Sequence, residues 1–175
     1  MLEIIRNWII NRDFDLATAD IFARALIFTS IIIISLIAYV FAKHFIVKGL
    51  AAIINKTATQ WDDMILRKRV FNRLAYFAPA IVLYISISTP LEGYEWLITL
   101  IDGVVLIYMI VIGILVIDAF LNASRDIYKL YDVSNRIPIK GFIQVIKIFI
   151  YFTSGIFIIS ILLNKTPIYL FSSLG

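Results

Sequence analysis

The stretch IFARALIFTSIIIISLIAYVFA, residues 21–42, decides the fold class of this chain. A helix rises about 1.5 Å per residue, so roughly 20 apolar residues in a row cross the ~30 Å hydrocarbon layer of a bilayer. Within the stretch, the run Ile31-Ile32-Ile33-Ile34 is apolar on every side of a helix, as a helix that faces lipid can be. The stretch therefore predicts a transmembrane helix.

The composition of the whole chain extends this prediction to a membrane protein. Of the 175 residues, 62% are hydrophobic and 16% are charged, and the mean hydropathy of +0.95 excludes a water-soluble domain of this length. A formal net charge of +4 would suit a nucleic acid partner, but the charges lie in loops between apolar runs, so we expect no nucleic acid to bind. We predict an all-α, polytopic membrane protein.

Three further apolar stretches are long enough to cross a bilayer. Together with the first, the expected spans cover residues 21–42, 70–89, 96–118 and 141–163. The second span is the weakest, because Asn72 and Arg73 lie at its start and Pro79, which should bend a helix, lies inside it. The predicted architecture is four transmembrane helices plus interfacial amphipathic helices.

The distribution of Lys and Arg sets the expected orientation of these spans. Most of the 16 basic residues fall in residues 43–73 and 125–140, whereas the turn that carries Glu92 and Glu95 has none. Short cytoplasmic connections carry the excess of basic residues. We therefore expect both basic connections on the cytoplasmic side and both termini on the outer side.

The first basic connection has a helical pattern of its own. Apolar residues recur at roughly helical spacing over residues 46–66, with polar residues between them. This pattern indicates either an amphipathic helix in the interface or a helix packed on other cytoplasmic parts of the protein. In the first case each basic residue near anionic head groups contributes ~1 kcal/mol to the free energy of binding to the membrane surface. The residues expected to face lipid head groups are Lys48, Lys56, Arg67, Lys68, Arg69 and Arg73.

No residue pattern in the sequence points to catalysis. The chain has no cysteine, and its single histidine, His44, excludes paired-histidine metal motifs. The Asp102-Gly103 pair, with Asp118 further on, invites comparison with membrane-embedded lipid-headgroup transferases. However, the sequence has Leu106-Ile107 where that pattern needs Ala-Arg, and it lacks the two further aspartates, four residues apart, that the pattern also needs. We expect no enzyme and no catalytic, cofactor-binding or metal-binding residue, with Asp102 solvated near the outer boundary.

Two intramembrane charges are expected at the same depth. Asp118 ends a helix that runs inward, and Lys147 lies near the start of the helix that returns outward. An ionisable residue inside a membrane is a functional candidate, because even insertion scales give it a cost of ~2.5 to 3.5 kcal/mol. We predict a polar contact between Asp118 and Lys147, joined by Gln144. In the alternative, each charge extends separately to the interface.

Several stretches resemble one known family. Gln60-Trp61-Asp62-Asp63 followed by Phe71-Asn72-Arg73-Leu74-Ala75, and Ile137-Pro138-Ile139-Lys140-Gly141 continuing to Ser173-Leu174-Gly175, are similar to the amino-terminal membrane region of small-conductance (MscS-type) mechanosensitive channels, in the YbdG-like miniconductance branch. The resemblance covers roughly residue 20 to the carboxyl end. It implies a tension-sensing domain of an ion channel that opens under membrane stretch for osmotic protection.

The resemblance also implies an arrangement along the chain. Residues 20–165 would form the transmembrane sensor domain, and residues 166–175 the start of a pore helix whose remainder is missing. The segment before them, residues 1–19, is expected on the outer side from its own pattern, because the apolar residues Leu2, Ile5, Trp8 and Ile9 indicate a short interfacial helix. Ser173 replaces the glycine that opens the pore helix in the family. The implied partners are membrane lipids and further copies of the chain in a heptamer. The implied location is the bacterial cytoplasmic (inner) membrane.

Two other functions fit the same apolar helices. A non-conducting membrane scaffold or accessory subunit would use them to bind partners. A transporter fragment is the second alternative, but the two helix pairs show no internal repeat and no convincing pair of broken helices at matching positions. A pore-helix sequence after residue 175 would favour the channel.

Overall fold

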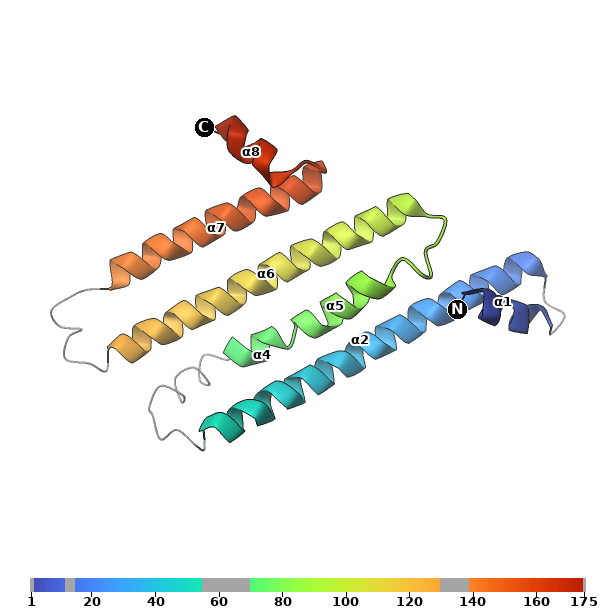
Figure 1. Cartoon of the computed structure of the whole chain (residues 1–175), viewed down its shortest axis with the longest axis horizontal. Coiled ribbons are helices and arrows are strands. Elements are labelled where there is room, and N and C mark those ends of the chain that lie inside the picture. Colours follow the sequence, from blue (N-terminus) through green and yellow to red (C-terminus); the bar gives the residue numbers. More distant parts are fainter. Residues whose placement is uncertain (1, 12–14, 55–69, 130–138, 175) are drawn as a thin grey trace.

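The computed structural model of the chain describes residues 2–11, 15–54, 70–129 and 139–174. Within these ranges the regular structure is helical, with no strand. The helices are α1 (Leu2–Ile10), α2 (Leu16–Ile54), α4 (Val70–Leu74), α5 (Phe77–Ser86), α6 (Glu95–Tyr128), α7 (Lys140–Leu163) and α8 (Pro167–Leu174) (Figure 1). The predicted all-helical fold is confirmed.

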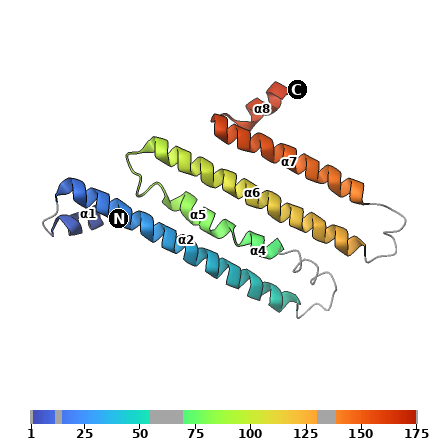
Figure 2. The same ribbon diagram turned by 180° about the vertical axis from the view of Figure 1, so that it is seen from behind.

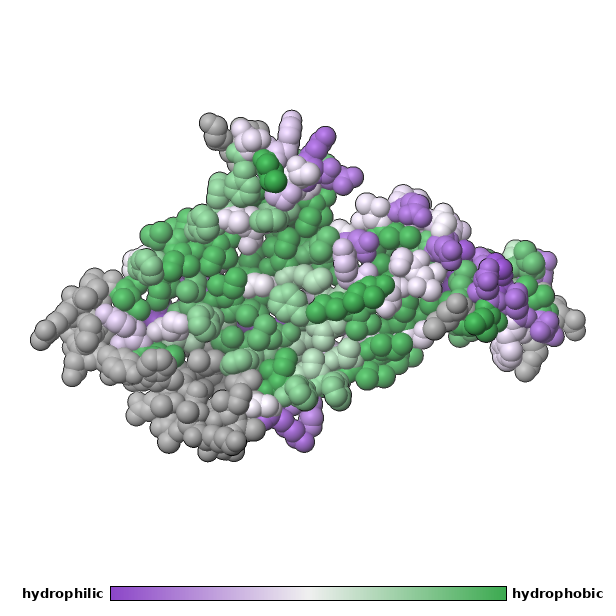
Figure 3. Space-filling view, in the orientation of Figure 1, coloured by the Kyte–Doolittle hydropathy of each residue, from purple (hydrophilic) through white to green (hydrophobic). Residues whose placement is uncertain are grey.

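Three of these helices are long and apolar enough to cross a membrane. They are residues 16–46 of α2, all of α6 and all of α7. Hydrophobic residues cover the middle of the molecule, and hydrophilic residues gather at the end that holds α1, around the connection between α7 and α8, and near the described end of α2 (Figure 3). This is the architecture of a multi-pass membrane protein.

The long helices lie side by side in a single layer. In order across the layer they are α2, the pair α4 and α5, α6 and α7, and each packs mainly on the next one along the chain (Figures 1 and 2). The directions alternate, so α2 and α6 end where α4 and α7 begin (Figure 1). Both basic connections therefore start and finish at one end of the molecule, as the sequence predicts.

The second predicted span is divided into two short helices by Pro79. Proline has no N–H to donate to the carbonyl of residue 75, and its ring crowds that carbonyl. Instead, the Ala78 N–H bonds the Ala75 carbonyl at 3.2 Å, and the Tyr76 N–H bonds the Arg73 carbonyl at 3.2 Å. Residues 70–86 together rise about 26 Å, which is shorter than the ~30 Å hydrocarbon layer. The fourth crossing thus stays a prediction.

The first span is longer than the sequence pattern suggests. We predicted a span over residues 21–42 and a separate amphipathic helix over residues 46–66, but α2 runs without interruption from Leu16 to Ile54. The lone Gly49 lowers helix propensity by only about 1 kcal/mol, and no proline lies in this range to stop the helix. Residues 55–66 of the predicted amphipathic segment lie outside the described residues.

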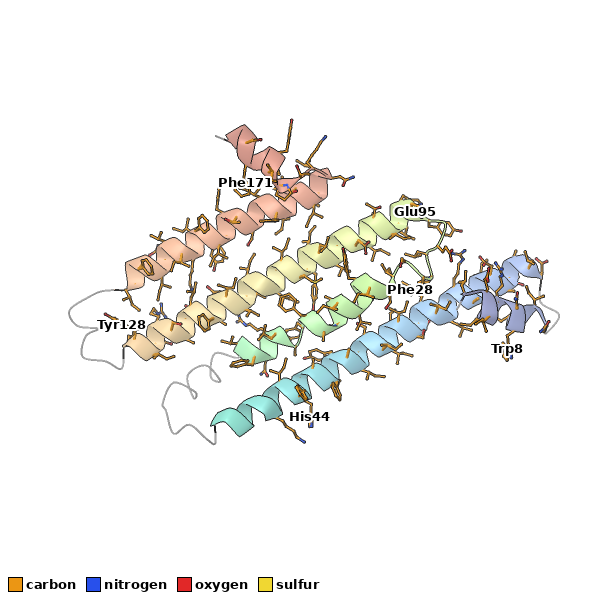
Figure 4. The ribbon with its side chains drawn as sticks, in the orientation of Figure 1. Trp8, Phe28, His44, Glu95, Tyr128 and Phe171 are labelled. Carbon is orange, nitrogen blue, oxygen red and sulfur yellow. The ribbon has the colours of Figure 1, made fainter. Side chains whose placement is uncertain are left out.

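Helix α1 packs along α2 and runs antiparallel to it. Its buried Leu2 belongs to one apolar cluster with Ile27 and Ile31, and its buried Ile9 belongs to a second cluster with Ala19 and Ala23. The two alanines are fully buried, which brings the helices close together. Trp8 lies at the exposed surface of this helix pair (Figure 4). The apolar face that predicted an interfacial helix is thus used, at least in part, against α2.

The single layer leaves most of its apolar surface uncovered. Only 17%, 17% and 11% of the residues in the most apolar windows of α2, α6 and α7 are buried within the described chain. Large apolar side chains are exposed on each of these helices, among them Phe41, Phe120 and Phe149. In water such faces would aggregate, so they must contact lipid or further protein.

Candidate functional site

The contact between α6 and α7 contains a charged pair. The Lys147 Nζ atom lies 2.6 Å from the Asp118 Oδ1 atom, and both side chains are largely buried, at 22% and 25% exposure. The structure therefore brings together two of the three residues predicted to form an intramembrane contact. A close, charge-assisted hydrogen bond of this kind stabilises more than a neutral one.

Two further side chains complete this group, which we call the α6–α7 polar cluster: Asp118, Asn122, Lys147 and Tyr151. The Asn122 Nδ2 group donates to Asp118 at 2.9 Å, and Lys147 donates to the Asn122 Oδ1 atom at 2.9 Å. The Tyr151 hydroxyl donates to Asp118 at 3.0 Å. The carboxylate thus accepts from three side chains, which offsets much of the cost of placing it in a membrane helix.

The sequence contains a signal for both added residues. Asn122 follows Asp118 by four positions, and Tyr151 follows Lys147 by four, so each lies one helical turn from a predicted site residue and on the same face. Gln144, which was predicted to join the contact, is exposed one turn before Lys147. Its side chain makes no hydrogen bond to another described residue.

The residues predicted to face lipid head groups do not share one environment. Lys48 is exposed on α2. Arg73 is half-buried at the end of α4, where its guanidinium donates to the backbone carbonyl of Leu115 on α6. That carbonyl lies one turn before Asp118, so Arg73 adds positive charge beside the α6–α7 polar cluster. The others, Lys56, Arg67, Lys68 and Arg69, lie outside the described residues.

A second polar group, which the sequence analysis missed, holds the opposite end of the layer together. Arg24 on α2 donates through Nε to the Asp20 carboxylate at 2.8 Å, and through one Nη1 group to the backbone carbonyls of Pro90 and Glu92 at 3.0 and 2.8 Å. Its guanidinium also lies 5.4 Å from the centre of the Tyr94 ring. Arg24 therefore fixes α2 to the turn between α5 and α6.

No family model and no solved structure matches this chain.

The side chains that could bind a metal ion do not gather at one place among the described residues. Within them, no group of three or more His, Cys, Asp or Glu side chains is placed to hold a metal ion. The single histidine, His44, is exposed near the described end of α2, apart from the α6–α7 polar cluster (Figure 4). The arrangement is instead that of neighbouring helices tied to one another by charged side chains near both ends.

Proposed function

We propose that the chain is the tension-sensing transmembrane part of a small-conductance-type mechanosensitive ion channel. The observation that supports this proposal best is the single layer of helices with uncovered apolar faces. Membrane tension favours whichever state of a protein occupies more area in the membrane plane, and it acts where helices meet lipid. A flat layer has far more lipid contact for its size than a compact bundle, so a change of its tilt changes its area strongly.

The polar contacts support the same proposal, because they join neighbouring helices into one body. Arg24 joins α2 to the turn that precedes α6, Arg73 joins α4 to α6, and the Asp118 and Lys147 pair joins α6 to α7. A tilt imposed on α2 by lipid therefore passes across the layer to α7. Through α7 it reaches α8, which in the proposed channel is the start of the pore helix.

The proposed protein works as a homo-oligomer in the bacterial inner membrane, a heptamer by family resemblance. The helices that the structure describes enclose no polar lumen of their own: they are rich in Ile, Leu, Val and Phe, and a conducting path needs polar or small residues that face water. Ion conduction in this proposal belongs to the helix that begins at α8. It is a transport function, without an enzymatic step.

The proposal is tested by measuring the layer under tension. Because the sequence contains no cysteine, spin labels can be attached to introduced pairs alone. Cysteines at Ile34 on α2 and Phe152 on α7, both exposed, report the width of the layer. In vesicles, lysophosphatidylcholine added to one leaflet should shift this distance by a few ångström, and the shift should reverse on its removal. A pair at Leu100 and Phe120, both on α6, should keep its distance.

An unchanged distance between Ile34 and Phe152 would favour the alternative, a non-conducting membrane scaffold. A second arm addresses conduction, with patch recordings of residues 1–175 in a host without mechanosensitive channels. We expect no discrete openings under suction. Reproducible openings would place the pore inside this layer and contradict the assignment of sensing and conduction to different helices.

The expected orientation gives a separate prediction. Cysteine at Glu92 should react from outside intact cells with an impermeant maleimide, and cysteine at Lys129 should react only after the membrane is opened. Both side chains are exposed, so burial does not explain a difference between them. Labelling at residue 129 but not at residue 92 from outside would reverse the orientation and place both termini in the cytoplasm.

A further inference from the structure

A cavity of about 720 Å³ lies at the end of the layer where α6 begins and α7 ends. Glu95 marks this end of α6 in Figure 4. The lining is mostly apolar and aromatic, and the two charged residues among its described members are Asp102 on α6 and Lys165 after α7. The two helices approach closely at its wall, since a Cβ atom added to Gly103 would lie 3.4 Å from the Ile161 Cγ2 atom. The volume is in the range of sites that hold small molecules.

Asp102 has a buried oxygen atom without a partner. Its Oδ1 atom is shielded from solvent and accepts no hydrogen bond from any residue of the described chain. The expectation that Asp102 is simply solvated does not hold for this atom. Buried polar atoms in native proteins nearly always have a hydrogen-bond partner, and a carboxylate in a membrane helix needs one most. The missing donor has to come from outside the described residues.

The end of α7 brings Lys165 to the same cavity. Asn164 adopts the left-handed conformation, at φ 50° and ψ 41°, and caps the helix. The Asn164 N–H bonds the Ile161 carbonyl at 3.1 Å, the Lys165 N–H bonds the Ser160 carbonyl at 3.0 Å, and the buried Ser160 hydroxyl donates to the Lys165 carbonyl. The backbone of Lys165 is thus fixed. Its exposed ammonium forms no ion pair within the described residues.

The depth of the cavity matches the boundary between head groups and acyl chains. Asp102 lies seven residues into α6, about 10 Å along the helix from its start. Asp118, in the polar cluster of the other end, follows after about 24 Å. Between them α6 is apolar over a length somewhat shorter than the ~30 Å hydrocarbon layer, so each aspartate lies just inside one boundary of that layer. Apolar lining residues such as Leu106 and Phe157 continue from the charged end toward this layer.

We propose that this cavity binds a phospholipid whose head group carries a primary ammonium beside its phosphodiester, as in phosphatidylethanolamine. The ammonium donates to the Asp102 carboxylate, the phosphodiester pairs with the Lys165 ammonium, and the acyl chains follow the apolar wall. A choline head group has no N–H to donate to the carboxylate. An anionic head group without an amine leaves Asp102 unpaired. The site does not depend on the proposed function in tension sensing.

The proposal is tested by titrating purified chain 1–175 in detergent with phosphatidylethanolamine and with phosphatidylcholine of the same acyl chains, followed by native mass spectrometry. The unmodified chain should bind the ethanolamine lipid about tenfold more tightly, the size expected for a charge-assisted hydrogen bond. Asp102→Asn should bring the ratio close to one. Lys165→Gln should weaken both lipids by a similar factor and keep the ratio, because both carry the phosphodiester.

Two further variants make the result specific. Glu95 lies at the same end of α6 but does not line the cavity. The control variant Glu95→Gln should therefore leave the affinities for both lipids unchanged. Leu106→Trp fills the cavity while Asp102 stays, and it should abolish the preference even if Asp102→Asn fails to fold. Equal affinity of the unmodified chain for both lipids, or a preference that survives Asp102→Asn, would overturn the proposal. So would Asp102-dependent stabilisation by calcium chloride in the absence of lipid, which would indicate a cation site.

Discussion

Replacing Lys147 by methionine should lower the free energy of unfolding by about 3 kcal/mol, because it leaves the Asp118 carboxylate largely buried without its cationic partner. Methionine keeps much of the length and apolar stem of lysine, so the loss reports the charge and its hydrogen bonds to Asp118 and Asn122. The measurement is unfolding of the full chain in mixed micelles by titration with sodium dodecyl sulfate, followed by circular dichroism.

A matched control is Lys140→Met. Lys140 is exposed in the first turn of the same helix, and its replacement should change the free energy of unfolding by less than about 0.5 kcal/mol. The double variant Asp118→Asn with Lys147→Met should recover part of the loss, with a coupling energy of at least about 0.5 kcal/mol. Additive effects of the two substitutions would mean that the pair contributes no joint stability, despite its 2.6 Å separation.

Replacing Arg24 by methionine should cost about 2 kcal/mol, since two backbone carbonyls of the turn between α5 and α6 and the Asp20 carboxylate lose a charged donor at once. The turn itself should loosen. We expect the amide hydrogens of residues 91–94 to exchange with deuterium about tenfold faster, and the same micelle titration to report the loss of stability.

Arg24→Lys separates charge from geometry in this contact. Lysine keeps the positive charge, but its single ammonium does not reproduce the planar guanidinium that reaches Asp20 and the carbonyls together, so most of the loss should remain. Arg6→Met is the control from α1, because Arg6 reaches Asp20 only at 3.9 Å and is more exposed. A lysine variant as stable as the original chain would show that a nearby charge, rather than the paired donors, fixes the turn.

The long apolar helices were the part of the fold that the sequence could predict. Hydropathy and length locate a span without knowledge of its neighbours, and α7, at Lys140–Leu163, lies within one residue of the expected 141–163. The ends of the helices could not be predicted in the same way. Apolar and polar residues alike continue a helix, so the extension of α2 to Ile54 and of α6 to Tyr128 was not visible in hydropathy. The bend in the second span was predicted from Pro79, and the structure adds that the helix is interrupted one turn before it.

A polar contact could be predicted from the sequence where the depth of its residues in the membrane is enough to place them together. Asp118 and Lys147 lie at matching distances from one connection, so their proximity follows from the order of the spans. The contacts of Arg24 do not follow from depth, because its partners are backbone carbonyls 66 and 68 residues away, and every residue carries such an acceptor. The cavity beside Asp102 depends on how α6, α7 and the chain after α7 meet, which no local pattern encodes.

The order of packing across the layer bears on how the protein is made. As the chain leaves the ribosome, α4 and α5 follow α2, which they contact, and α6 follows the pair on which it packs. Among the described helices, each long helix packs mainly on the segment just before or just after it in the chain. Domains generally assemble from the amino terminus during synthesis, and a chain whose partners are consecutive has few chances to pair wrongly on the way. Insertion into the membrane can thus proceed one helix at a time, with each new helix packing on the helix that was inserted before it.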